Sequence, residues 1–348
     1  MNQRGGAERV FAHIARAFPA APIYTALFDP QATGDLFPGR RINVSRLGRL
    51  PGVNHYFRAL APLYPAAFEA FDFSGYDTIV SSTTAWAKGV RVPSESVHVS
   101  YVNTVSRFVF AYDQYTSGFA LRDLARPLVA QLAKWDWEAA QRPTVLVANS
   151  HNVAARIRAH YGRDAAVLHC PVDLDRFTPG SGKGDYFLIA SRLLPYKHVE
   201  RAIDACARAR TPLLVVGSGP AEAALRRRAR HSTTSMLGFV DDRRLNDLLG
   251  NARAAILPAE EDFGLLPLEA AAAGTPTIAL RRGGALETIL EHETGEYFDG
   301  PTSESLQRVI ERFDRSRYDP QVLRRHAERF SPEAFMAALQ RLVADIPR

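Results

Sequence analysis

Short apolar runs alternate along the chain with longer segments in which apolar residues recur at helical spacing. The runs predict buried strands at residues 21–28, 77–82, 96–103, 144–148, 167–169, 186–190, 213–216, 254–257 and 277–280. The segments predict helices at residues 10–18, 118–141, 151–161, 199–208 and 243–249, a mostly helical stretch at 56–73 with a break near Pro62 and Pro65, and a terminal helix that Ser331 caps and that runs through Val343. In the helix at 118–141, an apolar stripe that includes Leu128, Leu132 and Trp135 is expected to face the core. This alternation predicts parallel sheets covered by helices, with functional side chains at the carboxyl ends of the strands.

A stretch rich in proline and glycine at residues 171–184 interrupts this alternation and predicts a linker. The chain has 348 residues, which fits two domains of ordinary size. We therefore expect one domain at residues 1–170 and a second at residues 185–330.

An acidic loop follows the predicted strand at 254–257 and leads into an alanine-rich helix. Gly264 stands at the mouth of this helix, where unsatisfied backbone N–H groups and the helix dipole suit a phosphate. Glu261 lies in the loop and Glu269 lies inside the helix, and carboxylates are good acceptors for sugar hydroxyls. This combination fits a nucleotide sugar. The alternative is a solvated acidic loop that only favours the helix N-terminus.

Two cations follow the predicted strand at 186–190. Arg192 and Lys197 both lie in the loop before the next helix. If a diphosphate binds at Gly264 and Leu265, these side chains could neutralise it and stabilise a departing nucleoside diphosphate. The alternative for each residue alone is an ordinary surface cation.

Two glycine motifs are weaker signals. Gly5 and Gly6 open the helix at 10–18, although no strand precedes them. Gly217-Ser218-Gly219 carries only two glycines of the dinucleotide fingerprint. The spacing of Asp173 and Asp175 is common by chance, and the two cysteines lack metal-ligand spacing, so we expect no metal centre.

The formal net charge is +6, and much of the excess lies in residues 1–60. Arginines alternate with apolar residues at 40–60, a pattern suited to peripheral contact with an anionic membrane or a lipid-phosphate acceptor. The alternative is a solvated basic loop and helix. No nucleic-acid-binding motif accompanies the charge. Because no transmembrane or signal-peptide pattern is found, we expect a cytoplasmic protein, peripheral at most at the inner face of the membrane.

These motifs together resemble the retaining GT-B glycosyltransferases of family 4. The resemblance rests most specifically on the Glu261–Glu269 element with its flanks and on Gly274-Thr275-Pro276. Supporting matches are Gly5-Gly6-Ala7-Glu8-Arg9-Val10, Asn149-Ser150, Pro171-Val172-Asp173 with Arg176-Phe177, Ser191-Arg192-Leu193 with Lys197, and Gly238-Phe239-Val240. The acidic loop and Gly283-Gly284-Ala285-Leu286-Glu287-Thr288 most resemble the O-antigen and polysaccharide mannosyltransferases.

The resemblance implies an α/β protein with two Rossmann-like domains whose parallel sheets face across a cleft. The donor would bind to the C-terminal domain and the acceptor to the N-terminal one, and the helix at 331–348 would cross back to the first domain. Arg192 and Lys197 would hold the diphosphate, Glu261 would lie by the transferred sugar and Glu269 by the ribose. The further donor-binding positions are Gly6, Phe239, Val240, Phe263, Gly264 and Leu265. The family requires no metal.

Two features depart from the family pattern. The strand that usually precedes the Gly-Gly loop is missing. Asn103 stands where the subgroup has a histidine near the reacting sugar, followed by the acceptor-side Arg107 and Asp113. Asparagine donates a hydrogen bond but is neither an acid nor a base near neutral pH.

The resulting hypothesis is a retaining transferase that moves a hexose, mannose from GDP-mannose, to a glycan or lipid-linked acceptor in cell-surface polysaccharide synthesis. The alternative is a truncated or non-catalytic relative that acts as a binding or partner subunit. A dinucleotide oxidoreductase is a third hypothesis, but the chain lacks its full glycine fingerprint and the acidic residue that should follow.

Overall fold

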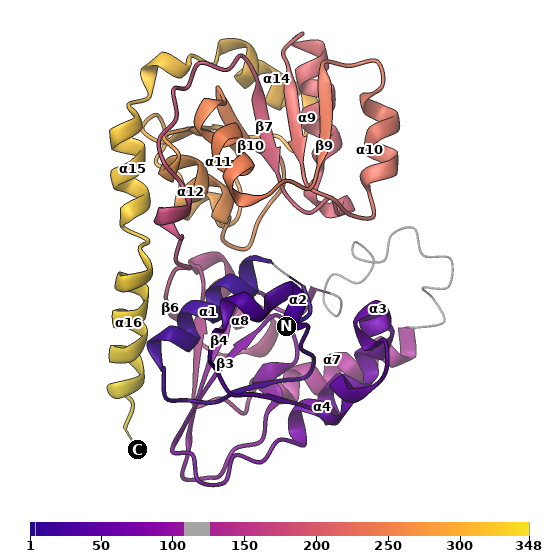
Figure 1. Cartoon of the computed structure of the whole chain (residues 1–348), viewed down its shortest axis with the longest axis vertical. Helices are drawn as coiled ribbons and strands as arrows, with labels where there is room; N and C mark the ends of the chain where they lie inside the picture. Colours follow the sequence, from indigo (N-terminus) through magenta and orange to yellow (C-terminus); the bar gives the residue numbers. More distant parts are fainter. Residues whose placement is uncertain (4, 108–125, 348) are drawn as a thin grey trace. The chain divides into compact units, whose positions relative to one another are not determined.

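The computed structural model describes residues 1–3, 5–107 and 126–347 of the chain. They divide into two compact units. The N-terminal unit comprises Met1–Cys170 and Glu333–Arg348, and the C-terminal unit comprises Pro171–Pro332. Both are Rossmann-like α/β units with parallel sheets (Figure 1).

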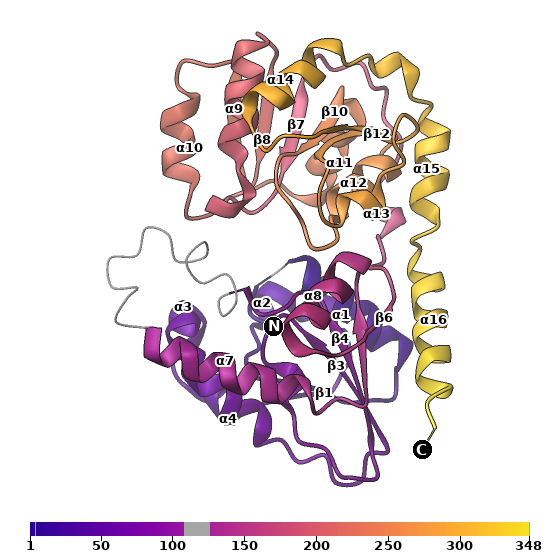
Figure 2. The same cartoon turned by 180° about the vertical axis from the view of Figure 1, so that it is seen from behind.

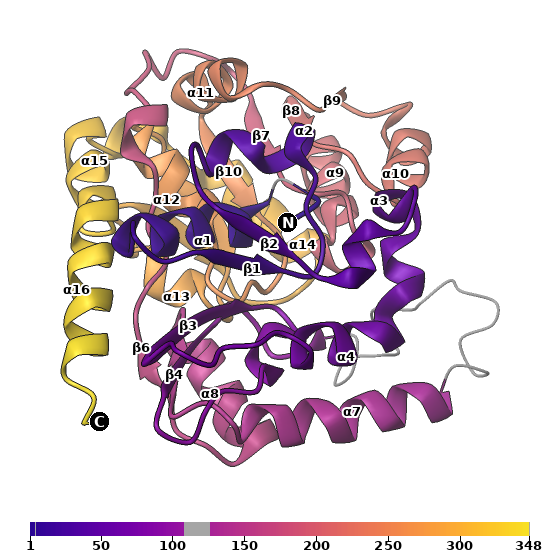
Figure 3. The same ribbon diagram turned by 60° about the horizontal axis from the view of Figure 1, so that its bottom comes forward.

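The described part of the N-terminal unit contains a four-stranded parallel sheet in the order β3-β4-β5-β6 and a separate two-stranded parallel sheet. Its strands are β1 (Ile23–Thr25), β2 (Ile42–Val44), β3 (Thr78–Thr83), β4 (Val97–Val102), β5 (Val145–Ala148) and β6 (Ala166–Val167). Its helices are α1 (Gly6–Ala17), α2 (Pro30–Thr33), α3 (Val53–Tyr56), α4 (Tyr64–Glu69), α7 (Arg126–Ala140), α8 (His151–Tyr161) and α16 (Pro332–Ala344). β1 and β2 lie apart from the larger sheet (Figure 3).

The C-terminal helix α16 packs within the N-terminal unit. The Phe335 ring meets the buried Tyr101 ring edge-on, with their centroids 5.7 Å apart. Gln340 Nε2 donates to the carbonyl oxygen of Ala17 at the end of α1, at 2.7 Å. These contacts attach the end of the chain to β4 and α1.

A buried ion pair joins the turn after β3 to α7. Lys88 Nζ donates to Asp136 Oδ1, and both side chains are almost fully buried. Asp136 also accepts from Ser106 Oγ at 2.5 Å and from Tyr161 OH at 2.7 Å. The predicted stripe on this helix is thus partly wrong. Leu128 is exposed, whereas Asp136, one turn after the buried Leu132, occupies the buried face.

The C-terminal unit contains one six-stranded parallel sheet in the order β12-β11-β10-β7-β8-β9. Its strands are β7 (Phe187–Ala190), β8 (Leu213–Val216), β9 (Thr234–Gly238), β10 (Ala254–Leu257), β11 (Thr277–Leu280) and β12 (Gly295–Phe298). Its helices are α9 (Val199–Arg208), α10 (Glu222–Ala229), α11 (Asp242–Asn251), α12 (Leu265–Ala272), α13 (Ala285–Thr288), α14 (Ser303–Arg312) and α15 (Pro320–Glu328). Every residue of β10 and β11 is buried, as expected for central strands covered on both faces.

The helices of this unit form two layers around the sheet. α9 packs with α10 and α14, whereas α12 packs with α15 (Figure 2). The sequence predicted β7, β8, α9, β10 and β11 closely, but did not predict β12, α14 or α15. Among the described residues, no helix combines the length and apolar character needed to cross a bilayer.

Candidate functional site

The site residues of the C-terminal unit gather where the strand order of its sheet reverses. β7 and β10 are neighbours, but the chain leaves β7 toward β8 and leaves β10 toward β11. In open parallel sheets, ligands bind beyond the carboxyl ends of the strands at this switch point. The loop that carries Arg192 and Lys197 follows β7, and the acidic loop follows β10. The two predicted motifs therefore flank the position where this architecture binds ligands.

An ion pair connects these loops. Lys197 ends the short 3-10 turn Pro195–Lys197, and its Nζ donates to Glu261 Oε1. Both side chains are mostly buried, with 18% of Lys197 and 15% of Glu261 exposed. Arg201, on α9, donates from Nη1 to the Pro258 carbonyl oxygen at 3.1 Å and so fixes the start of the acidic loop. Arg192, in contrast, is exposed. The loop after β7 thus carries one mostly buried cation, Lys197, paired with a carboxylate, and one exposed cation, Arg192.

The glycine-rich loop after β8 packs against the backbone of the loop that follows β7 and carries Arg192. Gly217 has a φ of +129° and Gly219 one of +156°, which side chains rarely adopt. A Cβ on either glycine would also overlap the backbone of Ser191 or Leu193. Leu193 N donates to the Ser218 carbonyl oxygen at 2.9 Å. These two glycines therefore serve close packing beneath the cationic loop, which accounts for the incomplete dinucleotide fingerprint.

The N-terminus of α12 begins at a glycine and has no side-chain cap among the described residues. Gly264 is the N-cap of this helix and has a φ of +89° in the left-handed region. No side chain caps the helix, so the first backbone N–H groups from Leu265 onward are not satisfied by a cap. The preceding Phe263 is buried. Uncapped N–H groups at a helix N-terminus are the donors that a phosphate would need, so Gly264 and Leu265 remain the predicted phosphate position.

A second glycine pair holds the acidic loop. Glu261 and Gly283 form a parallel bridge, and Gly284 N donates to the Glu261 carbonyl oxygen at 2.9 Å. A Cβ on Gly284 would overlap the backbone of Phe263. Gly284 therefore lets the loop after β11 lie directly against the acidic loop and sets its backbone path.

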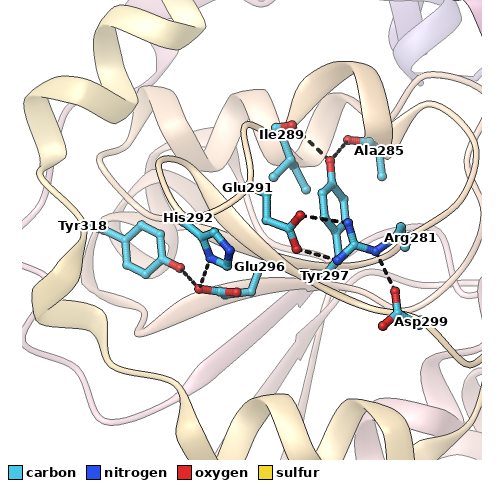
Figure 4. A network of polar contacts seen from close by, with 9 residues as sticks. All are labelled: Arg281, Ala285, Ile289, Glu291, His292, Glu296, Tyr297, Asp299 and Tyr318. Carbon is cyan, nitrogen blue, oxygen red and sulfur yellow. Dashed lines mark hydrogen bonds and ion pairs between the residues drawn. The ribbon is translucent and has the colours of Figure 1, made fainter.

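A polar network anchors the loop after β11 (Figure 4). The Arg281 guanidinium binds both carboxylate oxygens of Glu291, donates to Asp299 Oδ1 at 2.6 Å and lies over the Tyr297 ring at 4.6 Å. Tyr297 OH donates to the Ala285 and Ile289 carbonyl oxygens at 3.0 Å. Arg281 precedes Gly283 and Gly284, so the network fixes the base of the loop that supports Glu261. The Arg281 guanidinium therefore has a structural role, since its nitrogens already donate to Glu291 and Asp299.

Two carboxylates of this network and one histidine approach metal-ligand geometry. Glu291, His292 and Glu296 place potential ligand atoms within 4.8 Å of one another. Arg281 already holds Glu291, and Glu296 accepts from Tyr318 OH at 2.7 Å (Figure 4). The protein satisfies these acids itself, so the cluster is no evidence for a metal centre.

Glu269 lies on α12, one helix turn beyond the phosphate position. Its side chain is 18% exposed, and burial raises the pKa of its carboxyl group. Arg176 Nη1 lies 3.5 Å from Glu269 Oε1. Phe239 and Val240 follow β9, two strands away from β7, and Phe239 is 82% exposed. The structure brings Lys197 and Glu261 into contact and places the other C-terminal site residues at the same edge of the sheet.

In the N-terminal unit, Asn103 lies among small polar groups at the ends of β3, β4 and β5. Its Nδ2 donates to Ser82 Oγ at 3.0 Å and to the Thr83 carbonyl oxygen at 3.3 Å. The backbone carbonyl oxygen of Asn103 accepts from Asn149 Nδ2 at 2.9 Å. Ser150 caps α8, as predicted.

The remaining sites of the N-terminal unit are less informative. Gly6 is the exposed first residue of α1, and Arg107, which follows β4, is half-buried. The predicted acceptor-side Asp113 lies outside the described residues.

Comparisons with known proteins identify the family. A family model described as "Glycosyltransferase Family 4" matches residues 4–176, and one described as "Glycosyl transferases group 1" matches residues 173–332. The two matches overlap at residues 173–176 and together account for nearly the whole chain. The chain belongs to the GT-B glycosyltransferases of family 4.

Among the relatives of this glycosyltransferase, a D-inositol 3-phosphate glycosyltransferase of Streptomyces bingchenggensis is 30% identical over 58% of this chain and 53% of the relative. A GDP-mannose-dependent alpha-(1-6)-phosphatidylinositol dimannoside mannosyltransferase of Mycobacterium tuberculosis is 29% identical over 53% of this chain and 46% of the relative. The chain thus spans about half the length of the curated relatives it matches.

The solved structures agree on the fold. The structure of Anabaena Alr3699/HepE in complex with UDP superimposes with a TM-score of 0.71 at 17% identity, covering 99% of this chain and 98% of that one. At this identity the likeness supports the two-domain GT-B fold of the glycosyltransferase and nothing finer.

Sequence reasoning missed several residues whose contacts hold the loops of the candidate site in place. Arg201 contacts the acidic loop, Gly284 lies against Phe263, and Asp242 accepts from Arg176 Nη2 at 2.8 Å, in each case across a long separation in the sequence. Arg176 was visible as part of the Pro171–Phe177 motif, but no signal in the sequence indicated that it approaches Glu269.

Proposed function

We propose that this chain is a retaining hexosyltransferase that transfers mannose from GDP-mannose to a glycan or lipid-linked acceptor in cell-surface polysaccharide synthesis. The observation that carries the proposal is the Lys197–Glu261 ion pair at the sheet's switch point, beside the uncapped mouth of α12. Such a site offers cations and backbone donors for a diphosphate and a carboxylate for sugar hydroxyls. The name of the mycobacterial relative supports GDP-mannose as the donor.

In the proposed mechanism, the nucleoside diphosphate departs first. Negative charge develops on its leaving oxygen, and Lys197, Arg192 and the N–H groups of Leu265 and the residue after it stabilise that charge. These groups supply the positive charge that a metal ion would otherwise bring, so we propose that the reaction needs no metal. The acceptor hydroxyl then attacks from the face that the leaving group vacates, through an oxocarbenium-like state.

Thermal-shift titration with GDP, UDP, dTDP, ADP and GDP-mannose tests the donor assignment. A ligand that binds only the native state raises the melting temperature with the logarithm of its excess over Kd. We expect GDP and GDP-mannose to raise it and the other nucleotides to do so much less. A selective response to UDP, which Anabaena HepE binds, would replace the guanine assignment and keep the donor site. No response to any nucleotide by the folded protein would refute the site.

One observation favours the alternative of a non-catalytic binding subunit. Asn103 occupies the position where the subgroup resemblance expects a histidine, and its Nδ2 already donates to Ser82 and Thr83. Release of GDP from GDP-mannose in the presence of acceptor-containing membranes separates the two functions. A protein that binds GDP but releases none from GDP-mannose would be a binding subunit.

We further propose that a basic apolar patch contacts anionic lipid. This patch consists of the exposed residues Arg46, Arg49, Leu50, Tyr56, Arg58 and Leu63. The same segment contributes Leu47, Val53 and Tyr64 to a small buried core with Ala26 and Leu27. Arg40 does not belong to the patch, because its guanidinium binds carbonyl oxygens at the end of α1, including that of Phe18 at 3.0 Å.

Vesicle sedimentation tests this contact. Each basic residue near an anionic surface contributes on the order of 1 kcal/mol, so Arg46→Glu with Arg49→Glu should lower binding to phosphatidylglycerol vesicles by more than about tenfold. Arg308→Glu with Arg312→Glu on α14 changes the net charge equally and should bind like the parent. If both double variants lost the same amount of vesicle binding, binding would depend only on net charge, and the result would contradict the proposed patch.

A further inference from the structure

Arg176 connects two acidic side chains that come from different helices. Its Nε and Nη2 donate to Asp242 Oδ2 and Oδ1 at 3.0 and 2.8 Å, a bidentate pair with the first residue of α11. The remaining nitrogen, Nη1, lies 3.5 Å from Glu269 Oε1 on α12. The guanidinium carbon also lies 4.9 Å from the centre of the Phe177 ring. The plane of the guanidinium is therefore fixed from two sides, and its free edge faces Glu269.

The electrostatics around Glu269 show why this contact matters. Burial is the main cause that raises the pKa of the Glu269 carboxyl group, and the negative charges of Asp242 and Asp173 raise it further. Arg176 is the cation that lowers it. Loss of Arg176 would remove this lowering effect, while the burial of Glu269 and the charges of Asp242 and Asp173 would remain. A carboxylate in such surroundings tends to take up a proton.

Protonation would change what Glu269 can bind. An ionised carboxylate accepts hydrogen bonds at both oxygens, whereas a protonated one must also place a donor. Two neighbouring hydroxyl groups, such as those of a ribose, both donate most favourably to the ionised form.

We propose that Arg176 is a positioning residue for the donor site: it holds Glu269 ionised and oriented to accept hydrogen bonds from the ribose hydroxyls of the donor nucleotide. This inference rests on the proposed function, since it needs a nucleotide at the α12 mouth. The bidentate fork to Asp242 explains why arginine is used. A lysine has a single nitrogen and cannot hold Asp242 with two parallel bonds while facing Glu269.

Calorimetric titration with GDP from about pH 5.5 to about pH 8.5 tests the inference on the parent and on Arg176→Met. In the variant the pKa of Glu269 rises further, so GDP binding is lost as the pH falls through that higher value and returns as the pH rises. We expect the variant to bind GDP at least about tenfold more weakly than the parent at the acidic end, which corresponds to one pKa unit. At the alkaline end of the titration, the difference in GDP affinity between the variant and the parent should become smaller.

A nucleotide without ribose hydroxyls separates positioning from a structural role. Parent and Arg176→Met should bind 2′,3′-dideoxy-GDP with similar affinity, because Glu269 then has no hydroxyls to accept from. Arg176→Lys keeps a positive charge near Glu269, so its pH dependence should stay close to that of the parent. The matched control is Arg244→Met, an exposed arginine on the same α11 helix, which should bind GDP like the parent.

Either of two results would overturn the inference. In the first, Arg176→Met loses the same affinity for GDP as for dideoxy-GDP; in the second, it binds GDP as tightly as the parent at every pH. If Arg176→Met does not fold, Arg176→Lys serves as the test. Lysine cannot form the two parallel hydrogen bonds to Asp242, so Arg176→Lys should lower the affinity for GDP more than the affinity for dideoxy-GDP. Failure of the proposed function gives a different result. In that case the folded parent itself binds none of the nucleotides tested.

Discussion

Alanine in place of Lys197 is expected to lower kcat/KM for GDP-mannose by about 10²- to 10³-fold, the usual cost of removing one group that stabilises transition-state charge. Lys197 follows the strand at which the sheet reverses, and its ammonium group pairs with Glu261 across the switch point. No other lysine lies in this loop. The loss should appear mainly in kcat, because the charge on the departing diphosphate is larger in the transition state than in the bound donor.

The fold should survive this change. Lys197 lies at the end of a short turn, and its side chain reaches solvent in part. Circular dichroism and thermal melting should therefore match the parent closely. Lys183→Ala removes an exposed lysine from the same unit and should retain full activity. Near-parental turnover of Lys197→Ala would refute the assignment of the site.

A double variant separates two explanations of the loss. Removal of Lys197 also leaves Glu261 without this cation, so reduced activity could come from a misplaced carboxylate. If so, Lys197→Ala combined with Glu261→Gln should regain activity relative to Lys197→Ala. If Lys197 acts on the diphosphate, the double variant should stay at least as impaired.

The local parts of the fold could be predicted because their determinants are local. Ser150 caps α8, as its place before the helix predicted. The helix α9 begins and ends at the predicted residues, because helical periodicity depends on residues that are close together in the sequence. The buried strands β10 and β11 were equally clear, because both faces of each are covered and every residue except Thr277 is apolar.

The short or polar elements could not be predicted. β2 has three residues, none fully buried, and lies within the basic stretch. β12 contains Gly295 and Glu296, and it is a strand because it pairs with β11. Tertiary pairing decides such segments, and sequence pattern alone carries little signal for them.

The candidate site shows the same division. The residue types at the α12 mouth and after β7 predicted a place for a nucleotide sugar, because that chemistry depends on motifs of adjacent residues. The Lys197–Glu261 pair, the support of Phe263 by Gly284 and the approach of Arg176 to Glu269 depend on which strands are neighbours. Spacing along the chain does not contain that information.

The buried ion pair of the N-terminal unit leads to the second large effect. Methionine in place of Lys88 is expected to lower the free energy of unfolding by about 3–5 kcal/mol, because it leaves the buried Asp136 carboxylate without its cation. Ser106 and Tyr161 still donate to Asp136, but neither brings charge. Scanning calorimetry should show the loss as a drop in melting temperature on the order of 10 °C.

Two variants make this expectation specific. Lys134→Met lies on α7 with Asp136, but its side chain is 80% exposed, so it should change stability by no more than about 0.5 kcal/mol. Lys88→Met combined with Asp136→Leu removes both charges and should recover part of the loss, because apolar replacement of a whole buried pair is often nearly neutral. Recovery should stay incomplete, since Ser106 and Tyr161 lose their acceptor. If Lys88→Met melts like Lys134→Met, the buried pair contributes little to stability, and the segment from Asn103 to Arg107 must be held mainly by its hydrogen bonds to β3 and to Asn149.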